Sequence, residues 1–169
     1  MRNKKDVKKK LEELGKTLYK EIKEGKNPFL DVPIRALSNV YFNPKTKLIE
    51  LGDAKSRRYF FNVAHIRKFV QTIEVASLAK ELLDVDKHLS LRQVFYAIRK
   101  TLPGTKIDIV EDQTESNQAI EDLELITGAS REELHINAKK SGAAAGKIII
   151  KDKGDIIDWS KLGSGGWSI

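Results

Sequence analysis

Tyr96 and the two arginines around it are the side chains of this sequence best suited to covalent chemistry. Arg92 precedes the tyrosine by four residues and Arg99 follows it by three, so a helix brings all three to neighbouring positions. A phenol, with a pKa of about 10, is a weak nucleophile at neutral pH, but a nearby guanidinium favours the phenolate. Arginine also binds phosphate and stabilises charge on an attacked phosphorus. The pattern is therefore compatible with attack on a phosphodiester, but by itself it is more typical of an exposed tyrosine beside two solvated arginines.

A helix over residues 90–102 is predicted to carry this tyrosine. Ser90 and Gln93 match the capping box at its start, and Pro103 ends it. At about 100° per residue, Tyr96 points away from the buried face. That face consists of apolar residues that lie within about 60° of Leu91: Leu91 itself, Val94, Phe95, Ile98 and Leu102.

The remaining pattern predicts a mainly α fold with small β elements. Apolar spacing indicates helices at 4–24, 62–83 and 112–128. Strands are expected at 40–42 and 48–51, around a turn at 43–46, and also at 59–61, 107–110, 135–138, 147–150 and 156–157. Three helices followed by a small hairpin is the layout of a winged helix, a CAP-like variant of the helix-turn-helix.

The chain is predicted to divide into three parts. Residues 1–61 form an N-terminal extension with a helical arm and a β-hairpin, and residues 62–162 form the winged-helix domain with Tyr96. Residues 163–169 have the glycine- and serine-rich composition of a linker.

The charge of the 169-residue chain suits a polyanionic partner. Its net charge is +7, from 31 basic and 24 acidic side chains. Residues 55–100 hold ten basic and four acidic side chains, whereas residues 106–135 hold two and nine, which predicts an electrostatically polarised molecule. Basic stretches are nonetheless more often solvated faces than nucleic-acid sites. The absence of cysteine excludes disulfides and cysteine-based zinc sites, and no apolar run is long enough to span a membrane.

Three other candidate sites are weaker. The carboxylates Glu111, Asp112 and Glu115 could bind a metal, but their place at a helix start favours capping and dipole roles. His135 is predicted to be a packed residue in a strand. The segment from Gly142 to Gly146 lacks the spacing of a phosphate-binding loop, which favours a structural role for its small residues.

Four segments resemble DNA topoisomerase VI A subunits and their meiotic double-strand-break relatives. The stretch Leu91–Tyr96 is similar to the family motif R-x-x-[YF]-Y, with Phe95 where tyrosine is frequent. Asn117-Gln118 at a helix start, the segment 130–136 and the segment 141–146 follow in the family's order. In the last of these Gly142 and Gly146 match, while Ser141 replaces the usual lysine. The resemblance extends from about residue 66 to the end of the chain.

The resemblance implies roles for particular residues. Tyr96 would be the DNA nucleophile and Arg92 would be required for cleavage, giving a transient double-strand break through a 5′-phosphotyrosyl link. Gly142 and Gly146 would lie near the DNA. Geometry and charge add five possible contacts with the backbone of double-stranded DNA, which would make binding sensitive to salt: Arg99, Arg57, Arg58, Arg67 and Lys68.

The resemblance also implies partners and cofactors. We expect a homodimer of A subunits, an ATP-binding B subunit in a heterotetramer, and an acidic Toprim part that binds Mg²⁺ and that this sequence does not contain. No metal ligand is assigned within the chain, which alone would not cut DNA. The output would be ATP-dependent relaxation or decatenation, in the cytoplasm near the nucleoid of an archaeon or in a eukaryotic nucleus.

Two other functions fit parts of the sequence. A winged-helix regulator would use Arg92 and Arg99 as phosphate anchors without chemistry. A protein-interaction module would use the narrow apolar stripe of the first helix.

Overall fold

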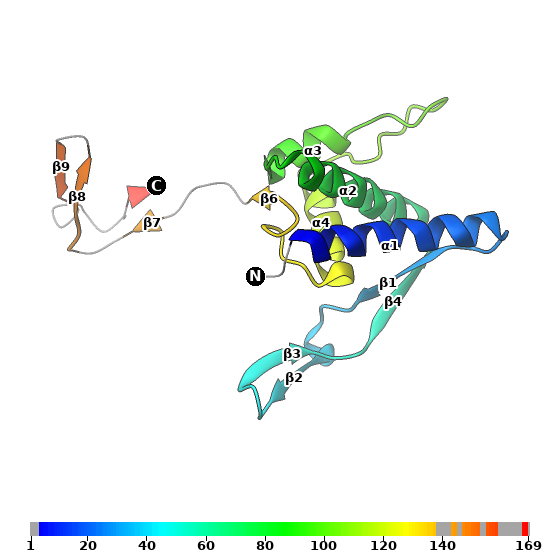
Figure 1. Cartoon of the computed structure of the whole chain (residues 1–169), viewed down its shortest axis with the longest axis horizontal. Helices are drawn as coiled ribbons and strands as arrows, with labels where there is room; N and C mark the ends of the chain where they lie inside the picture. The colour runs from blue at the N-terminus through cyan, green and yellow to red at the C-terminus, as the bar shows by residue number, and fades with distance from the viewer. Residues whose placement is uncertain (1–3, 138–142, 145–146, 153–154, 159–166, 169) are drawn as a thin grey trace. The chain divides into compact units, whose positions relative to one another are not determined.

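The computed structural model describes residues 4–137, 143–144, 147–152, 155–158 and 167–168, in two compact units, Met1–Asn137 and Ala138–Ile169 (Figure 1). The helices of the first unit are α1 (Lys4–Lys23), the 3-10 turn η1 (Leu37–Asn39), α2 (Ile66–Val85), α3 (Leu91–Ile98) and α4 (Gln113–Thr127). Its strands are β1 (Phe29–Pro33), β2 (Val40–Asn43), β3 (Leu48–Leu51), β4 (Lys55–Tyr59), β5 (Leu89–Ser90) and β6 (Ile136–Asn137). The second unit contains β7 (Ala143–Ala144), β8 (Ile149–Asp152), β9 (Asp155–Asp158) and β10 (Trp167–Ser168).

This architecture confirms the predicted fold class, which is mainly α with small two-stranded sheets and resembles a winged helix. The hairpin expected near the end of the chain is the antiparallel pair β8–β9, in which Ile150 faces Ile157. The two units are defined by which residues pack together. They do not test the domain boundaries predicted after residues 61 and 162, which stay predictions. Within the described residues, none of the helices combines the length and the apolar character needed to cross a membrane.

The core of the first unit lies among α2, α3 and α4 (Figure 1). Each helix contributes an apolar stripe at helical spacing, and Val75, Val94 and Ile120 are completely buried where the stripes meet. Full burial of one such side chain contributes roughly 1.5–3 kcal/mol. The first helix, α1, adds Val7 and Leu11 to this core, so the N-terminal arm is packed on the helices rather than extended from them.

A second apolar cluster joins the N-terminal sheet to the helices. Strands β1 and β4 pair antiparallel, and Leu30 and Val32 of β1 pack with Leu18 and Phe69. The adjacent hairpin β2–β3 forms as predicted, with Phe42 opposite Ile49. Both strands of this hairpin leave large apolar side chains exposed.

The β-hairpin is joined to β1 and β4 by one buried amide. The side chain of Asn39 donates to the carbonyl oxygens of Ile34 and Ala54, at 2.8 and 3.1 Å, and accepts from the N–H of Ala54 at 3.1 Å. A Cβ atom at position 52 would lie 2.6 Å from the Asn39 side-chain oxygen, so glycine is needed there for this close approach.

The entrance to α3 is fixed by a short parallel ladder. Strand β5 pairs with β6, with Leu89 beside Ile136 and Ser90 beside Asn137. His135, which precedes β6, is buried, donates from Nδ1 to the Lys87 carbonyl oxygen at 3.0 Å, and stacks on His88 with ring centroids 3.9 Å apart. The prediction that His135 is a packed residue is therefore confirmed, although it lies just before the strand.

The connection after α3 differs from the prediction. The helix ends at Ile98 rather than at residue 102, and Leu102 is exposed instead of buried. Pro103 disfavours helical geometry at Leu102, and the chain turns back. Backbone bonds Leu102 N–H to Ile107 and Ile109 N–H to Lys100 close a small loop, in which the strand expected at 107–110 is reduced to one bridge.

Two other expected elements are shorter or shifted. Helix α2 begins at Ile66 rather than at residue 62, because Asn62 accepts the N–H groups of Ala64, His65 and Ile66 in a turn before the helix. Of the strand expected at 59–61, only Tyr59 belongs to β4, whose other residues are polar.

Candidate active site

Tyr96 stands on the exposed face of α3, as predicted. Its side chain is 56% exposed, whereas the neighbouring Val94 and Ile98 are buried in the core. Arg92, one turn earlier, donates to the phenolic oxygen from Nη2 at 3.2 Å and Nε at 3.4 Å. The helix thus places the Arg92 guanidinium against the phenolic oxygen of Tyr96, the predicted nucleophile.

Arg92 has no carboxylate partner among the described residues. A guanidinium has five N–H donors in a planar fork, and only those of Nη2 and Nε reach the phenol. The remaining donors are available to an anion that approaches Tyr96. This arrangement suits an attacked phosphodiester, whose charge increases as the nucleophile approaches.

Three polar side chains hold α3 in place. Ser90 and Gln93 form the predicted capping box: the Ser90 hydroxyl accepts the Gln93 N–H at 3.3 Å, and the Gln93 side chain accepts the Ser90 N–H at 2.8 Å. Gln113, from the first turn of α4, donates to the Leu91 carbonyl oxygen at 3.1 Å. These bonds fix the turn of the helix that carries Arg92.

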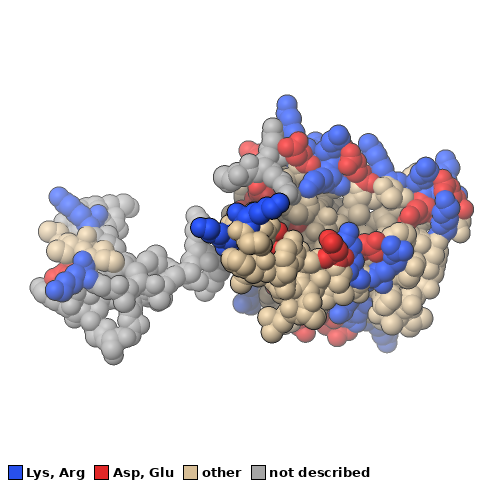
Figure 2. All heavy atoms as spheres, turned by 90° about the horizontal axis from the view of Figure 1, so that it is seen from below, with Lys and Arg blue, Asp and Glu red and all other residues tan. Residues whose placement is uncertain are grey.

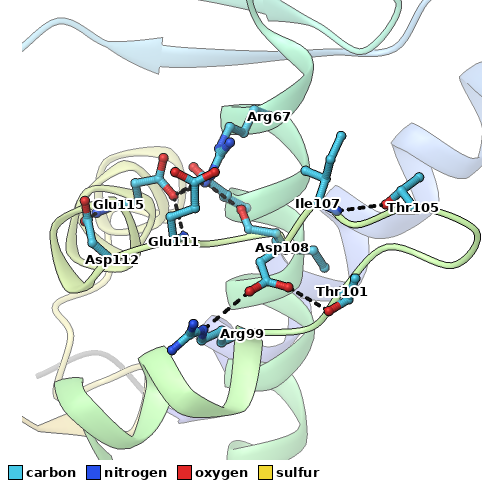
Figure 3. A network of polar contacts seen from close by, with 11 residues as sticks. Arg67, Arg99, Thr101, Thr105, Ile107, Asp108, Glu111, Asp112 and Glu115 are labelled. Carbon is cyan, nitrogen blue, oxygen red and sulfur yellow. Dashed lines mark hydrogen bonds and ion pairs between the residues drawn. The ribbon is translucent and has the colours of Figure 1, made fainter.

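Arg99 points to a different partner. It is the C-cap residue of α3, and its Nε lies 3.5 Å from an oxygen of Asp108 (Figure 3). The other Asp108 oxygen accepts the Thr101 hydroxyl at 2.6 Å. The Thr101 hydroxyl and the Arg99 guanidinium lower the pKa of the Asp108 carboxyl, which is therefore ionised at neutral pH. The structure brings Arg92 to Tyr96 but places Arg99 beside Asp108.

The carboxylates near α4 serve structural roles. Asp112 caps the helix by accepting the N–H groups of Thr114 and Glu115, as predicted. Glu115 closes no reciprocal bond to Asp112; it accepts instead from the Glu111 N–H at 2.9 Å and from Arg67 at 3.0 Å (Figure 3). Arg67 bridges Glu111 and Glu115, and these carboxylates raise the pKa of the Arg67 guanidinium. No cluster of three metal-binding side chains occurs in the described part of the chain.

Comparison with known proteins identifies the family of the chain. A family model described as type IIB DNA topoisomerase matches residues 67–136, which include α3. The A subunit of type 2 DNA topoisomerase 6 from Pyrococcus abyssi is 52% identical over 163 residues, covering 96% of this chain and 43% of that protein. The chain belongs to the type IIB DNA topoisomerase A-subunit family.

More distant relatives extend the same family. The corresponding A subunit of type 2 DNA topoisomerase 6 from Hyperthermus butylicus is 35% identical over 161 residues, covering 91% of this chain and 42% of that protein. The A subunit of DNA topoisomerase 6 from Arabidopsis thaliana is 33% identical over 138 residues, covering 82% and 30%. The chain thus spans less than half the length of each of these relatives.

Most of the arginines predicted to contact the DNA backbone form ion pairs with carboxylates of this topoisomerase-family chain. Arg57 makes two 2.8 Å bonds to Asp31, and Arg58 forms a largely buried pair with Asp122. Arg67 is paired as described above, whereas Lys68 is exposed and forms no ion pair with the described residues. Their contacts with DNA stay predictions, as does the contact of Arg99.

Gly142 and Gly146 lie outside the described residues. Sequence reasoning missed Asp108 and Gln113, which contact the ends of α3. A signal existed for Asp108, because Thr101 and Asp108 flank the turn at Pro103-Gly104 and can face each other once that turn closes.

The charge prediction for this topoisomerase-family chain needs correction. The basic stretch 55–100 and the acidic stretch 106–135 are not separate poles, because pairs such as Arg58–Asp122 and Arg67–Glu115 join them. Figure 2 shows basic and acidic side chains interspersed on one face of the first unit. An unneutralised arginine such as Arg92 is consequently more informative than the net charge.

Proposed function

We propose that this chain is the DNA-binding and DNA-cleaving part of a type IIB topoisomerase A subunit, with Tyr96 as the nucleophile. The observation that carries the proposal is the exposed Tyr96 side chain, whose oxygen receives hydrogen bonds from an arginine without a carboxylate partner among the described residues. The family membership of the chain gives the same reaction class.

In the proposed reaction, Tyr96 attacks a backbone phosphorus of double-stranded DNA. A bond forms between the phenolic oxygen and phosphorus, and the bond from phosphorus to the 3′ oxygen breaks. The phenolic proton leaves, and the 3′ oxygen gains a proton to become a hydroxyl. The energy of the broken ester is retained in the 5′-phosphotyrosyl link, so the reverse step reseals the strand. Arg92 orients Tyr96 and neutralises charge on the phosphate.

We propose that Mg²⁺ is bound outside the residues that the structure describes. The described carboxylates near the site are engaged in capping and ion pairs and do not fit a metal centre. We assign the metal to an acidic Toprim part, and no step above passes through it. The proposed assembly is a homodimer of A subunits with an ATP-binding B subunit, which relaxes or decatenates DNA near an archaeal nucleoid or in a nucleus. Without these parts the chain is expected to be inactive.

The test is a search for DNA covalently attached to protein. The chain is combined with the Toprim part, the B subunit, ATP, Mg²⁺ and supercoiled DNA, and the mixture is denatured before electrophoresis. We expect an adduct with the unmodified chain and none with Tyr96→Phe. Tyr19→Phe is the matched control, because Tyr19 is also exposed, at 68%, but lies on α1.

An adduct that persists in Tyr96→Phe overturns the nucleophile assignment. DNA binding without any adduct, in the presence of all parts, favours the winged-helix regulator instead.

A further inference from the structure

Asp108 holds two donors that lie just beyond the C-terminal end of α3. Its Oδ2 is 3.5 Å from the Arg99 Nε, and its Oδ1 accepts the Thr101 hydroxyl at 2.6 Å. Figure 3 shows the carboxylate between the two side chains. An anion with two oxygens therefore bridges a guanidinium and a hydroxyl, as a phosphate group does in its protein sites.

The ion pair between Arg99 and Asp108 is loose compared with other arginine pairs of the chain. Arg57 makes two contacts of 2.8 Å with Asp31, and Arg131 lies 2.9 Å from Glu124. Arg99 makes one contact at 3.5 Å, and its side chain is 50% exposed. Exposed ion pairs of this kind contribute little to stability, so a competing anion can displace the carboxylate at little cost.

Arg99 also lies in line with the proposed cleavage residues. Arg92 and Arg99 are seven residues apart, which places them within about 20° of one another and about 10 Å apart along the helix axis. Tyr96 lies between them along that axis. A strand of DNA whose phosphate meets Arg92 and Tyr96 can therefore present another phosphate toward Arg99.

We propose that Arg99 and Thr101 form a binding site for a second DNA backbone phosphate, which Asp108 occupies when DNA is absent. The inference rests on the proposed function, because it takes the exposed face of α3 as the DNA-binding face. A phosphodiester carries the same negative charge as the carboxylate. It also belongs to the same DNA strand as the phosphate at Tyr96, so the two phosphates bind together. When DNA binds, its phosphate thus replaces the Asp108 carboxylate as the anion held by Arg99 and Thr101.

The test measures the affinity of the full chain for a short fluorescein-labelled duplex by fluorescence anisotropy at fixed salt. Asp108→Asn removes the competing charge while retaining an acceptor for Thr101, and we expect binding about 3- to 10-fold tighter. Asp84→Asn is the matched control: Asp84 is 33% exposed against 30% for Asp108, and it pairs with lysines on α1 and α2. We expect the control to change affinity less than about 2-fold.

A double variant separates a local effect from a change in net charge. Arg99→Ala alone should weaken binding, and Asp108→Asn should give no gain in the Arg99→Ala background. A gain that persists without Arg99, or that equals the gain of Asp84→Asn, overturns the proposal. Competition with inorganic phosphate identifies the source: displacement of the duplex at millimolar phosphate would show a site for the free anion and contradict a site built for DNA.

This assay is independent of cleavage. It is carried out without the Toprim part, the B subunit and ATP, so the response to Asp108→Asn is measured on binding alone. Failure of the adduct experiment with a normal Asp108 response rejects the nucleophile alone, whereas adduct formation without that response rejects the second phosphate site alone.

Discussion

The hydrogen bonds from Arg92 to the Tyr96 oxygen support the proposed role of Tyr96 as a nucleophile. The Arg92 guanidinium orients the phenolic oxygen by donating to it from Nε and Nη2. Because Arg92 has no competing carboxylate in the described chain, its other N–H groups are available for the phosphate. One side chain can therefore act on the attacking and the attacked group.

Replacement of Arg92 by lysine should separate cleavage from binding. Lysine retains the charge but loses the planar fork, so it cannot serve the phenol and the phosphate together. We expect adduct formation to fall by about 100-fold or more, while affinity for duplex DNA changes less than about 3-fold. Adduct yield and anisotropy measured on the same preparation check this.

Arg35→Lys is the matched control for that experiment. Arg35 is similarly exposed, at 56%, and pairs with Glu121 at a distance of 3.3 Å on another part of the unit. Equal losses in both variants, or cleavage at the unmodified rate in Arg92→Lys, would contradict the proposed role of Arg92.

At this scale the sequence predicted the exposed position of Tyr96 next to Arg92, but not the position of Asp108. The first two share a regular helix, in which periodicity alone fixes direction. The position of Asp108 depends on how residues 100–109 turn back, and no periodicity encodes that turn. The same reason explains why Arg99 was expected beside Tyr96 and is found beside Asp108.

Helix α3 has only eight residues, which is too short to be stable by itself in water. Its order depends on the burial of Val94 and Ile98 and on the bonds at its N-terminus. The N-terminal bonds come from the capping box and from Gln113. Loss of any of these bonds affects the segment that presents Tyr96.

Ser90→Ala should therefore destabilise the chain. Removal of an N-cap hydroxyl costs about 1 kcal/mol, because an N–H of the first turn loses its acceptor. Urea unfolding followed by circular dichroism measures the change. Ser90→Asp should restore most of the loss, since aspartate also caps helices.

Ser77→Ala provides the comparison on α2. Ser77 is exposed in the interior of that helix, where alanine is favoured by helix propensity, so no loss of stability is expected. If Ser90→Ala is as stable as the unmodified chain, the capping box does not control α3.

The sequence predicted those helices and strands that a single local pattern of residues encodes. The helices at α1 and α4 and the hairpin β2–β3 follow from apolar spacing and turn residues. The pairs β1–β4 and β5–β6 were not predicted, because each joins segments that are distant in sequence. The shortened α3 reflects Pro103, which disfavours helical geometry at Leu102, the residue before it.

The whole first unit includes α1, which is attached by packing and by ion pairs. Val7 and Leu11 enter the core, and Lys8 lies 2.5 Å from Asp84 of α2. Hydrogen bonds from Lys8 and then from Lys80 lower the pKa of Asp84 to about 2. Attachment of α1 is consequently sensitive to acid.

The stabilising effect of Asp84 should depend on pH with a definite sign. The folded pKa of Asp84 is about 2, below the unfolded value of about 3.9. The contribution is therefore complete above about pH 4 to 5 and is lost as pH falls toward 2. We expect Asp84→Asn to be less stable than the unmodified chain at pH 7 and equally stable near pH 2.

Denaturant midpoints across this pH range measure the difference. Glu13→Gln on the exposed side of α1 is the control, because Glu13 makes only a 3.7 Å contact with Lys9. A stability difference for Asp84→Asn that is the same at every pH would show that the carboxylate charge is not responsible.

The β5–β6 pair has a mechanical consequence. Ser90, where α3 begins, is paired with Asn137, where the first unit ends, and the two strands run parallel. Tension on the chain after Asn137 is therefore carried across the ladder to the cap of α3, as well as along the covalent chain that precedes Asn137. Helix α3, which carries the proposed nucleophile Tyr96, therefore receives part of such a force at its N-terminal cap.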